Sequence, residues 1–561
     1  MKFNRREFVK RSAIAGVGLA LPWKLSLNRA HGQVVPQMPL PGSAIPQFVD
    51  PMPGLAELGA IVAGTEEIVL EMMEFQAEPL PTGTFVAGVK PKTWVWGYLP
   101  RGQTFRSTHL GPIVIATRGI PTQMRFVNKL GDTSTSNVLA WTRSTDQTLA
   151  WADPLNNELN ACAQLAEQGQ LPSGACAQNY MGPIPACVHI HGGEVPAWLD
   201  GGPDAWYTSD GAHRGHAFYT HPGVPSLGNE AVYRYPNSQE AAPIWFHDHT
   251  LGATRLNVYA GLAGGYLILD PANNPPNLPD LVPLIIQDRM FDTNGQLYFP
   301  AGVPFIPNPN HPFWVPEFSG DVICVNGKAW PFMNVQPKRY TFLFVNGSNA
   351  RAYEMMITTS TGVNLPMYQI GTDGGYLDKP ALLNRLVILP GERATVIVDF
   401  AGLPPGATAM IRNTAKHPYP NGVTVNGRTT GRVMQFRVVA PTAADTSYDP
   451  ATLAPLRTPM VRLSDPVTGS VAPGVVVHKK RQLTLNEVMG MPVTINGIAY
   501  PGGPLEVLVN NTKYLGIDKN VVRPDFTPIT INGITTYYSE LPVEGETELW
   551  EIINLTADAH P

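Results

Sequence analysis

Three short runs rich in β-branched and aromatic residues, each ending in asparagine, recur along the 561-residue chain. The runs are QMRFVN (123–128), YTFLFVN (340–346) and ELWEIIN (548–554). Their final asparagines lie about 200 residues apart, and an Asn-Gly pair precedes the second and the third run. One such match could arise by chance, but three in order at similar spacing predict three related β domains.

The turn-forming residues favour the same class. The chain holds 53 Gly and 56 Pro, which interrupt long helices and supply turns between short strands. We therefore predict an all-β chain of sandwich domains. The expected segments are a Pro-rich strap lying over the first domain (33–54), domain 1 (55–272), domain 2 (278–440) and domain 3 (455–561).

Domain 1 carries a polar insertion at 133–188 that is longer than an ordinary connection. Cys162, Cys176 and Cys187 lie in it, and we expect a local disulfide between two of the three in an oxidising compartment. Domain 3 differs in another way, because only seven residues follow Asn554. We therefore expect the third sandwich to be truncated, with unpaired strand edges and an exposed core face.

The amino terminus reads as an export signal over residues 1–32. Arg5 and Arg6 are followed by an apolar run at 12–22, which is too short to span a bilayer. The paired arginines resemble a twin-arginine signal. This predicts export by the twin-arginine machinery to the periplasm or the extracellular space, with no stable membrane insertion after signal removal. The net charge of -5 disfavours nucleic acid as a partner.

Two histidine pairs are the strongest chemical signal. His189 and His191 flank Ile190, and His247 and His249 flank Asp248, both in aromatic- or apolar-rich runs. Residues i and i+2 of a strand point to the same face, so each pair can present two imidazoles in one direction. One such pair could be a hydrogen-bonded core pair, whereas two in one domain predict a transition-metal site. No Cys-x-x-Cys or His-Glu-x-x-His motif is present, which disfavours a structural zinc site and a zinc protease.

The sequence around these pairs resembles the three-domain multicopper oxidases, most closely the bacterial spore-coat laccase and bilirubin-oxidase branch. The matching segments are HIHGGEVPAWLDGGPDAW (189–206), YRYPNSQEAAPIWFHDHTLGATRLNVYAGLAGGYLILD (233–270), IIQDRMFDTNGQLYFP (285–300), VNGKAWPF (325–332), QIGTDGGYL (369–377), LPGERATVIVDF (389–400) and ELWEIINLTADAHP (548–561). The resemblance implies three cupredoxin-like Greek-key β-sandwich domains, the third truncated.

The resemblance also implies roles for individual residues. His189 matches a type 2 copper ligand, and the other three histidines of the two pairs, His191, His247 and His249, match ligands of the type 3 copper pair. Asp200 matches an acidic position that supplies protons near this cluster. His560, in the final His-Pro, matches a type 1 copper ligand.

The implied activity is a laccase-like coupling of one-electron oxidation of phenolic or similar small substrates to four-electron reduction of O2 to water. The alternatives are a cuprous or ferrous ion oxidase, and a non-enzymatic exported cupredoxin scaffold. The implied ligand set also needs a later His-x-His and a His-Cys-His motif, and the last cysteine of this sequence is Cys324. We expect that the sequence is the amino-terminal portion of a longer enzyme. The competing explanation is a complete chain that has lost oxidase activity.

Overall fold

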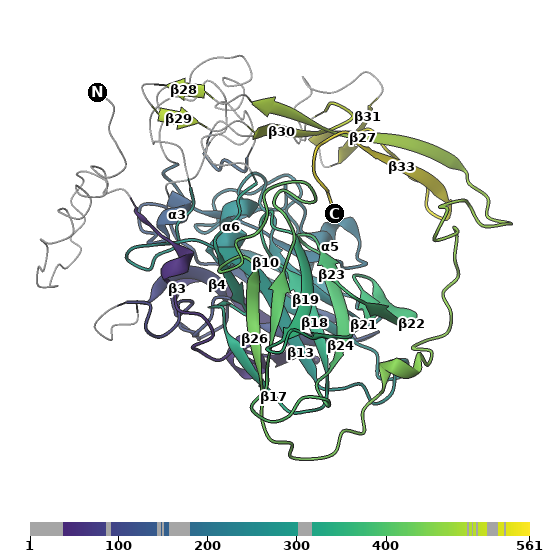
Figure 1. The fold of residues 1–561 in the computed structure, drawn as a ribbon. Coiled ribbons are helices and arrows are strands. Elements are labelled where there is room, and N and C mark those ends of the chain that lie inside the picture. The colour runs from purple at the N-terminus through teal and green to yellow at the C-terminus, as the bar shows by residue number, and fades with distance from the viewer. Residues whose placement is uncertain are drawn as a thin grey trace, which may run out of the picture. The chain divides into compact units, whose positions relative to one another are not determined.

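The computed structural model describes residues 37–85, 91–142, 147, 151–155, 180–300, 317–490, 493–495, 498–500, 503–512, 526–531 and 534–561. The predicted signal at 1–32 and most of the predicted insertion at 133–188 lie outside these ranges. Within them the chain is mostly β-strand, which confirms the all-β prediction (Figure 1). None of the described helices has both the length and the apolar composition that a membrane span requires.

Two sheets pack face to face within the predicted first domain. One has the order β10 (Glu230–Tyr235), β6 (Thr122–Asn128), β3 (Ile68–Ala77) and β4 (Thr93–Pro100). The other has the order β2 (Ile61–Val62), β5 (Ile113–Thr117), β12 (Ala263–Leu269), β11 (Ala242–Asp248) and β8 (Val188–His191). The Phe246 ring of β11 lies 5.1 Å from the Tyr98 ring and 6.0 Å from the Phe126 ring of the facing sheet. These contacts between aromatic rings form part of the core of the sandwich.

A second, larger pair of sheets follows. The seven-stranded sheet has the order β16 (Lys328–Ala329), β15 (Val322–Val325), β13 (Leu281–Arg289), β18 (Arg339–Asn346), β24 (Arg393–Asp399), β21 (Met367–Thr372) and β22 (Gly375–Leu383). The six-stranded sheet runs β17 (Phe332–Val335), β26 (Arg432–Val438), β25 (Thr408–Asn413), β19 (Tyr353–Thr359) and β20 (Asn364–Leu365), with β23 (Leu386–Ile388) also on β19. Phe342 and Phe436 meet across the two sheets at 5.4 Å.

The last sheet has three strands in the order β30 (Gly503–Val509), β27 (Lys479–Gly490) and β33 (Glu548–Asn554). Two hairpins accompany it, β28 (Val493–Ile495) with β29 (Ile498–Tyr500) and β31 (Thr527–Ile531) with β32 (Ile534–Tyr538). In the described residues no further strand pairs with β33.

The three recurring asparagines accept the same local hydrogen bond. Each is the last residue of its strand, and each accepts a hydrogen bond on Oδ1 from the backbone amide two residues later. The donors are Leu130 for Asn128 (3.2 Å), Ser348 for Asn346 (3.0 Å) and Thr556 for Asn554 (2.9 Å). This Asx turn closes each strand and explains why the sequence pattern ends in asparagine.

The described part of the Pro-rich strap lies mainly against residues of the predicted second domain. Pro39–Leu40 (β1) pairs with Phe291–Asp292 (β14), and the Phe48 and Met52 amides donate to the carbonyls of Trp330 and Phe332. The prediction that the strap lies over the first domain is therefore wrong. Because β17 is an edge strand, its carbonyls are open to the few amide donors that a Pro-rich segment has.

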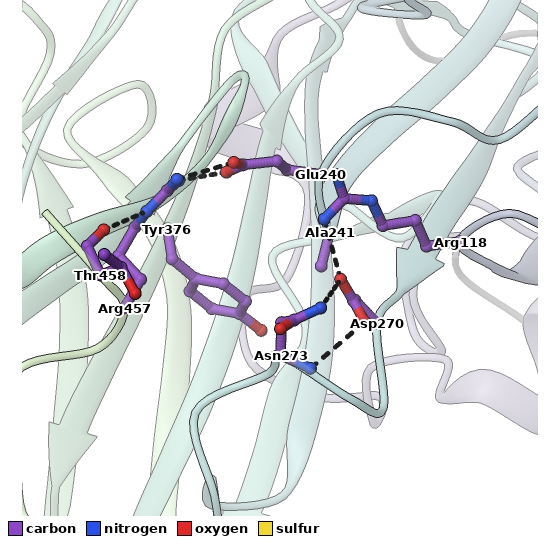
Figure 2. A pocket seen from close by; sticks show the side chains of 8 residues that line it. All are labelled: Arg118, Glu240, Ala241, Asp270, Asn273, Tyr376, Arg457 and Thr458. Atoms are coloured by element: carbon purple, nitrogen blue, oxygen red, sulfur yellow. Dashed lines mark hydrogen bonds and ion pairs between the residues drawn. The ribbon is translucent and has the colours of Figure 1, made fainter. Parts of the chain in front are cut away.

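A polar pocket of about 330 Å³ marks the junction of the first sandwich, the second sandwich and the segment that leads to the last sheet (Figure 2). Its lining residues are Arg118, Glu240, Ala241, Asp270, Asn273, Tyr376, Arg457 and Thr458. Arg457 forms an ion pair with Glu240 through two guanidinium nitrogens, and Arg118 pairs with Asp270 at 2.9 Å. These pairs neutralise most of the charge in the pocket and tie the segment around Arg457 to the first sandwich.

Candidate metal centre

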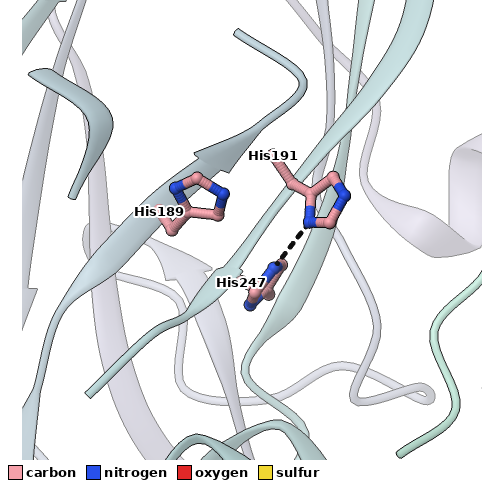
Figure 3. Close-up of side chains that lie close together, drawn as sticks. All are labelled: His189, His191 and His247. Carbon is pink, nitrogen blue, oxygen red and sulfur yellow. Dashed lines mark hydrogen bonds between the residues drawn. The ribbon is translucent and has the colours of Figure 1, made fainter. Parts of the chain in front are cut away.

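Strand register brings the two histidine pairs together. Strands β8 and β11 pair antiparallel, with His189 opposite His247 and His191 opposite Trp245. Directly opposed residues share a face of the sheet, and so do residues two apart on one strand. His189, His191 and His247 therefore lie on one face, as the i, i+2 spacing predicts (Figure 3).

The imidazoles lie close enough to share a metal ion or a small cluster. One ring nitrogen from each of His189, His191 and His247 lies within 4.8 Å of the others. His191 Nδ1 is 3.1 Å from His247 Nε2, the contact drawn in Figure 3. The ring of His249, just beyond the end of β11, lies 4.9 Å from the His189 ring. The structure thus brings together all four histidines of the two pairs.

Backbone carbonyls orient two of the rings. His189 Nδ1 donates to the carbonyl oxygen of Asp200 at 2.7 Å, and His247 Nδ1 donates to the carbonyl oxygen of Asp248 at 2.7 Å. A hydrogen bond from Nδ1–H to a carbonyl fixes the tautomer in which Nε2 carries the free lone pair. Both rings therefore present Nε2 as a ligand atom before any metal arrives.

The surroundings favour the uncharged form of His191, His247 and His249. Burial, together with the nearby Arg393 guanidinium, lowers the pKa of His191 to about 3. Burial, followed by the neighbouring His189 and His191, holds the pKa of His247 well below its ordinary value. Burial also lowers the pKa of His249. Neutral imidazole is the form that binds metal, so protons do not compete for these nitrogens near neutral pH.

The donor set fits copper. Late transition metals such as copper favour imidazole ligands, and this face of the sheet offers four. His249 supplies a further sign, because its Nδ1 is buried and has no hydrogen-bond partner among the described residues. A buried polar nitrogen without a partner is costly unless a ligand satisfies it.

Asp200 lies beside this cluster. It ends the short helix α5 (Ala197–Asp200), where Gly201 follows in the left-handed conformation (φ 70°). Its carboxylate Oδ2 is 3.4 Å from His189 Nδ1 and is partly exposed. Partial burial raises the pKa of this carboxyl, but the contact with His189 outweighs it, so the net pKa is lowered. A partly exposed carboxylate at this place can exchange protons with solvent, and the proton-supply role of Asp200 stays a prediction.

The fifth predicted ligand lies elsewhere. His560 groups with Asp558 and Glu487, and its Nε2 is 2.8 Å from Thr556 Oγ1. The structure does not place His560 with the four histidines, and its role as a type 1 copper ligand stays a prediction.

Cys187 is a buried free thiol whose Sγ lies 3.6 Å from the carbonyl oxygens of Gly201 and Gly202. It therefore takes no part in the expected local disulfide, while Cys162 and Cys176 lie outside the described residues. Cys324 is also a buried free thiol, as expected for a small core residue.

Asp248, between His247 and His249, has a structural role that was not predicted from the sequence. The Asp248 side chain is fully buried and accepts hydrogen bonds from the amides of Cys187 and Thr250, both at 3.0 Å, and from Thr250 Oγ1 at 2.9 Å. Burial raises the pKa of this carboxyl to about 6. Its position inside the His-x-His pair was the only available signal. Asp248 fixes the end of β11 to the residue that precedes β8.

A turn of the second sandwich supports the centre from the other side, and the sequence carried no signal for this contact. A Cβ on Gly391 would lie 2.8 Å from His191 Cε1, and a Cβ on Gly192 would lie 2.2 Å from Arg393 Nη2. Arg393 is held by Asp373 at 2.9 Å. The Trp245 ring lies 4.3 Å from the His247 ring and 5.2 Å from the His191 ring. Gly391, Arg393 and Trp245 thus limit where these two imidazoles can lie.

Gly391→Ala should weaken copper binding because its methyl group would displace the His191 ring. Gly391 has φ of 87°, so any side chain also adds backbone strain. Gly406→Ala is the matched control, since Gly406 has φ of 88° but no atom within 4 Å of the new Cβ. Both variants should lose about 1 kcal/mol of unfolding free energy. Only Gly391→Ala should lower the copper affinity measured by competition with a chelator, and equal affinities would refute the contact.

The metal-free chain should lose stability in acid because of its buried histidines. A histidine whose pKa is lower in the folded chain stabilises the fold above its ordinary value of 6.5, and this contribution is lost as the pH falls toward about 3. For His191 alone the slope is at most about 1.4 kcal/mol per pH unit. Urea titrations at several pH values should show a shallower decline for His191→Gln than for the unmodified chain. If the unfolding free energy of both chains declined equally with pH, His191 would take up its proton in the folded chain near its ordinary pKa.

Comparison with known proteins adds independent information. No protein-family model matches the chain. The chain is 31% identical over 497 residues to "Multicopper oxidase LPR1 homolog 5" of Oryza sativa subsp. japonica, covering 87% of this chain and 60% of that protein. It is 31% identical over 509 residues to "Multicopper oxidase LPR1 homolog 3" of the same plant, covering 87% of this chain and 77% of that protein.

A bacterial relative adds to the sequence comparison, and a solved structure shows a similar fold. The chain is 34% identical over 386 residues to "Laccase" of Bacillus subtilis (strain 168), covering 67% of this chain and 63% of that protein. The fold is similar to that of the McoA multicopper oxidase from Aquifex aeolicus, with a TM-score of 0.51 at 21% identity over 79% of this chain and 73% of that chain. The chain spans about 60% of the length of several of these curated relatives.

Proposed function

Because this chain belongs to the multicopper oxidase family, we propose that its four-histidine centre holds copper and serves laccase-like oxidation of phenolic or similar substrates with O2 as the acceptor. The observation that carries the proposal is the clustering of imidazole nitrogens from β8 and β11 within 4.8 Å. In the proposed assignment His189 serves type 2 copper, and His191, His247 and His249 serve type 3 copper. His560 serves type 1 copper, and no residue of the printed sequence matches the remaining ligands that the resemblance implies.

The chain's own residues would act by orientation and proton supply. The carbonyls of Asp200 and Asp248 hold His189 and His247 in the tautomer whose Nε2 carries no proton, and burial disfavours protonation of His247. Bound copper supplies one-electron transfer between the substrate and O2. Asp200, whose carboxylate is partly exposed and lies 3.4 Å from His189 Nδ1, would carry protons from solvent toward the site where water forms.

Export remains part of the proposal. The paired arginines and the short apolar run of residues 1–32 support delivery by the twin-arginine machinery to the periplasm or the extracellular space. That route carries folded proteins, which would suit a fold whose histidines are already oriented for metal.

Copper loading followed by two oxidation assays tests the function. The purified full chain should retain copper after desalting, and its electron paramagnetic resonance signal should show nitrogen hyperfine structure. O2 uptake with a phenol is then compared with O2 uptake with Fe(II). A preference for Fe(II) would overturn the substrate class, and loss of all copper on desalting would overturn the metal centre in favour of a scaffold. Retained copper without O2 uptake would restrict this chain to metal binding.

A further inference from the structure

His191 differs from its neighbours in how its ring is held. The rings of His189 and His247 each donate Nδ1–H to a backbone carbonyl. His191 Nδ1 instead faces His247 Nε2 at 3.1 Å, and the His191 ring has no other hydrogen bond among the described residues. Packing therefore orients this ring, and part of that packing comes from the second sandwich.

The packing surface is the turn that precedes β24. A Cβ on Gly391 would lie 2.8 Å from His191 Cε1 and 3.1 Å from His191 Nε2, so the turn can approach the ring this closely only with glycine at this position. Arg393 begins β24 and donates Nη1–H to the Gly391 carbonyl at 3.0 Å. Arg393 thus holds the turn that touches His191.

The Arg393 guanidinium also contacts the first sandwich. Its Nε donates to the carbonyl of Pro243, on β11, at 3.3 Å, and a Cβ on Gly192 would lie 2.2 Å from its Nη2. Pro243 lies four residues before His247, and Gly192 directly follows His191. The guanidinium therefore contacts both segments that carry the histidines.

The positive charge of Arg393 is buried, whereas its counter-charge is not. The Arg393 side chain is 4% exposed, and its Nη1 lies 2.9 Å from Asp373 Oδ1, whose side chain is 45% exposed. Solvent screens an exposed carboxylate more than a buried guanidinium, so the two charges do not cancel in the protein interior. The low pKa of His191, which follows from burial and then from Arg393, agrees with a net positive field at this ring.

We propose that Arg393 sets the balance between Cu(I) and Cu(II) at the copper that His191 binds, and so couples the second sandwich to the copper centre. The inference rests on the proposed function, because it needs copper at the four histidines. A fixed positive charge repels Cu(II) more than Cu(I). Reduction of Cu(II) to Cu(I) by one electron from the substrate lowers this repulsion by one unit of charge. Arg393 is not a ligand but a positioning residue whose charge raises the reduction potential.

Affinities for Cu(I) and Cu(II) test the inference without an oxidase assay. On the full chain, Cu(II) affinity is measured by competition with a chelator in air, and Cu(I) affinity by competition with bicinchoninate without oxygen. Arg393→Gln should lower the ratio of Cu(I) to Cu(II) affinity by about tenfold, which equals about 59 mV of reduction potential. Arg393→Lys keeps the charge but loses the planar fork, so both affinities should fall while the ratio stays within about twofold.

Two further variants separate charge from structure. Asp373→Asn removes the counter-charge, while Oδ1 can still accept the hydrogen bond from the Arg393 amide, so the ratio should rise. The rise should stay below about threefold, because the Asp373 side chain is partly exposed. Arg339→Gln is the control, since Arg339 pairs with Asp445 and stands opposite Asp399, at the other end of β24 from Arg393. Arg339→Gln should leave the ratio unchanged.

The outcomes distinguish this inference from the proposed function. An unchanged ratio in Arg393→Gln and Asp373→Asn, with copper still bound, would overturn the inference and leave the metal centre standing. Equal losses of both affinities in Arg393→Gln and Arg393→Lys would show a purely structural role, and a similar ratio change in Arg339→Gln would show a general effect of net charge. Either result would overturn the inference. If Arg393→Gln does not fold, Asp373→Asn decides. Failure of the unmodified chain to bind either ion would overturn the proposed function itself, and the inference with it.

Discussion

Copper affinity should fall by more than about 100-fold when His247 is replaced by alanine, a larger loss than removal of an outer-shell partner causes. His247 is the most central of the four imidazoles, because it stands opposite His189 in the strand register and its Nε2 lies 3.1 Å from His191 Nδ1. Its Nδ1 already donates a hydrogen bond to the Asp248 carbonyl, so the substitution removes Nε2 as a ligand of the metal. The other rings cannot replace it, since each is fixed to its own strand position.

Isothermal titration or chelator competition on the full chain measures this loss. His213→Ala is the control, because His213 lies in a separate loop and its hydrogen bonds to Thr208 use only the His213 backbone. This control should bind copper like the unmodified chain. If His247→Ala retained wild-type affinity, the metal would lie elsewhere, and the group of Glu487, Asp558 and His560 would be the next place to look.

Asp248→Ala should destabilise the fold by about 3 kcal/mol or more, because it leaves three buried donors without an acceptor. Those donors are the Cys187 amide, the Thr250 amide and the Thr250 hydroxyl. Copper affinity should fall as well, since Asp248 fixes the end of β11 from which His247 and His249 project. Urea denaturation measures the first effect and chelator competition the second.

The chain offers a matched control at Asp465. This carboxylate accepts the same kinds of bond, from the amides of Val467 and Thr468 and from Thr468 Oγ1, but it lies in an exposed turn. Asp465→Ala should therefore cost less than about 1 kcal/mol, because water replaces the lost acceptor. Equal losses for the two variants would show that the burial of Asp248 adds nothing to its contribution.

The local part of the metal centre could be predicted from the sequence. The i, i+2 spacing places the two imidazoles of each histidine pair on one face of a strand, whatever the fold. The recurring asparagines correctly predicted where β6, β18 and β33 end. Register between β8 and β11 could not be predicted, because it depends on pairing between strands more than 50 residues apart.

Contacts between residues far apart in the sequence could not be predicted. Gly391 contacts His191 although the two residues are about 200 positions apart. The sequence around neither residue indicates this contact. The strap shows the same limit, because its extended character followed from its prolines, whereas its location depended on which carbonyls the second sandwich left open.

Half of the candidate metal centre belongs to a short edge strand of its sheet. β8 is four residues long and lies at the edge of the sheet, where among the described residues it pairs with β11 alone, whereas β11 pairs with a strand on each side. Fraying of β8 would carry His189 and His191 away while His247 stayed in place. Bound copper would act as a cross-link between the two strands, so the rate of copper release would report how often β8 opens.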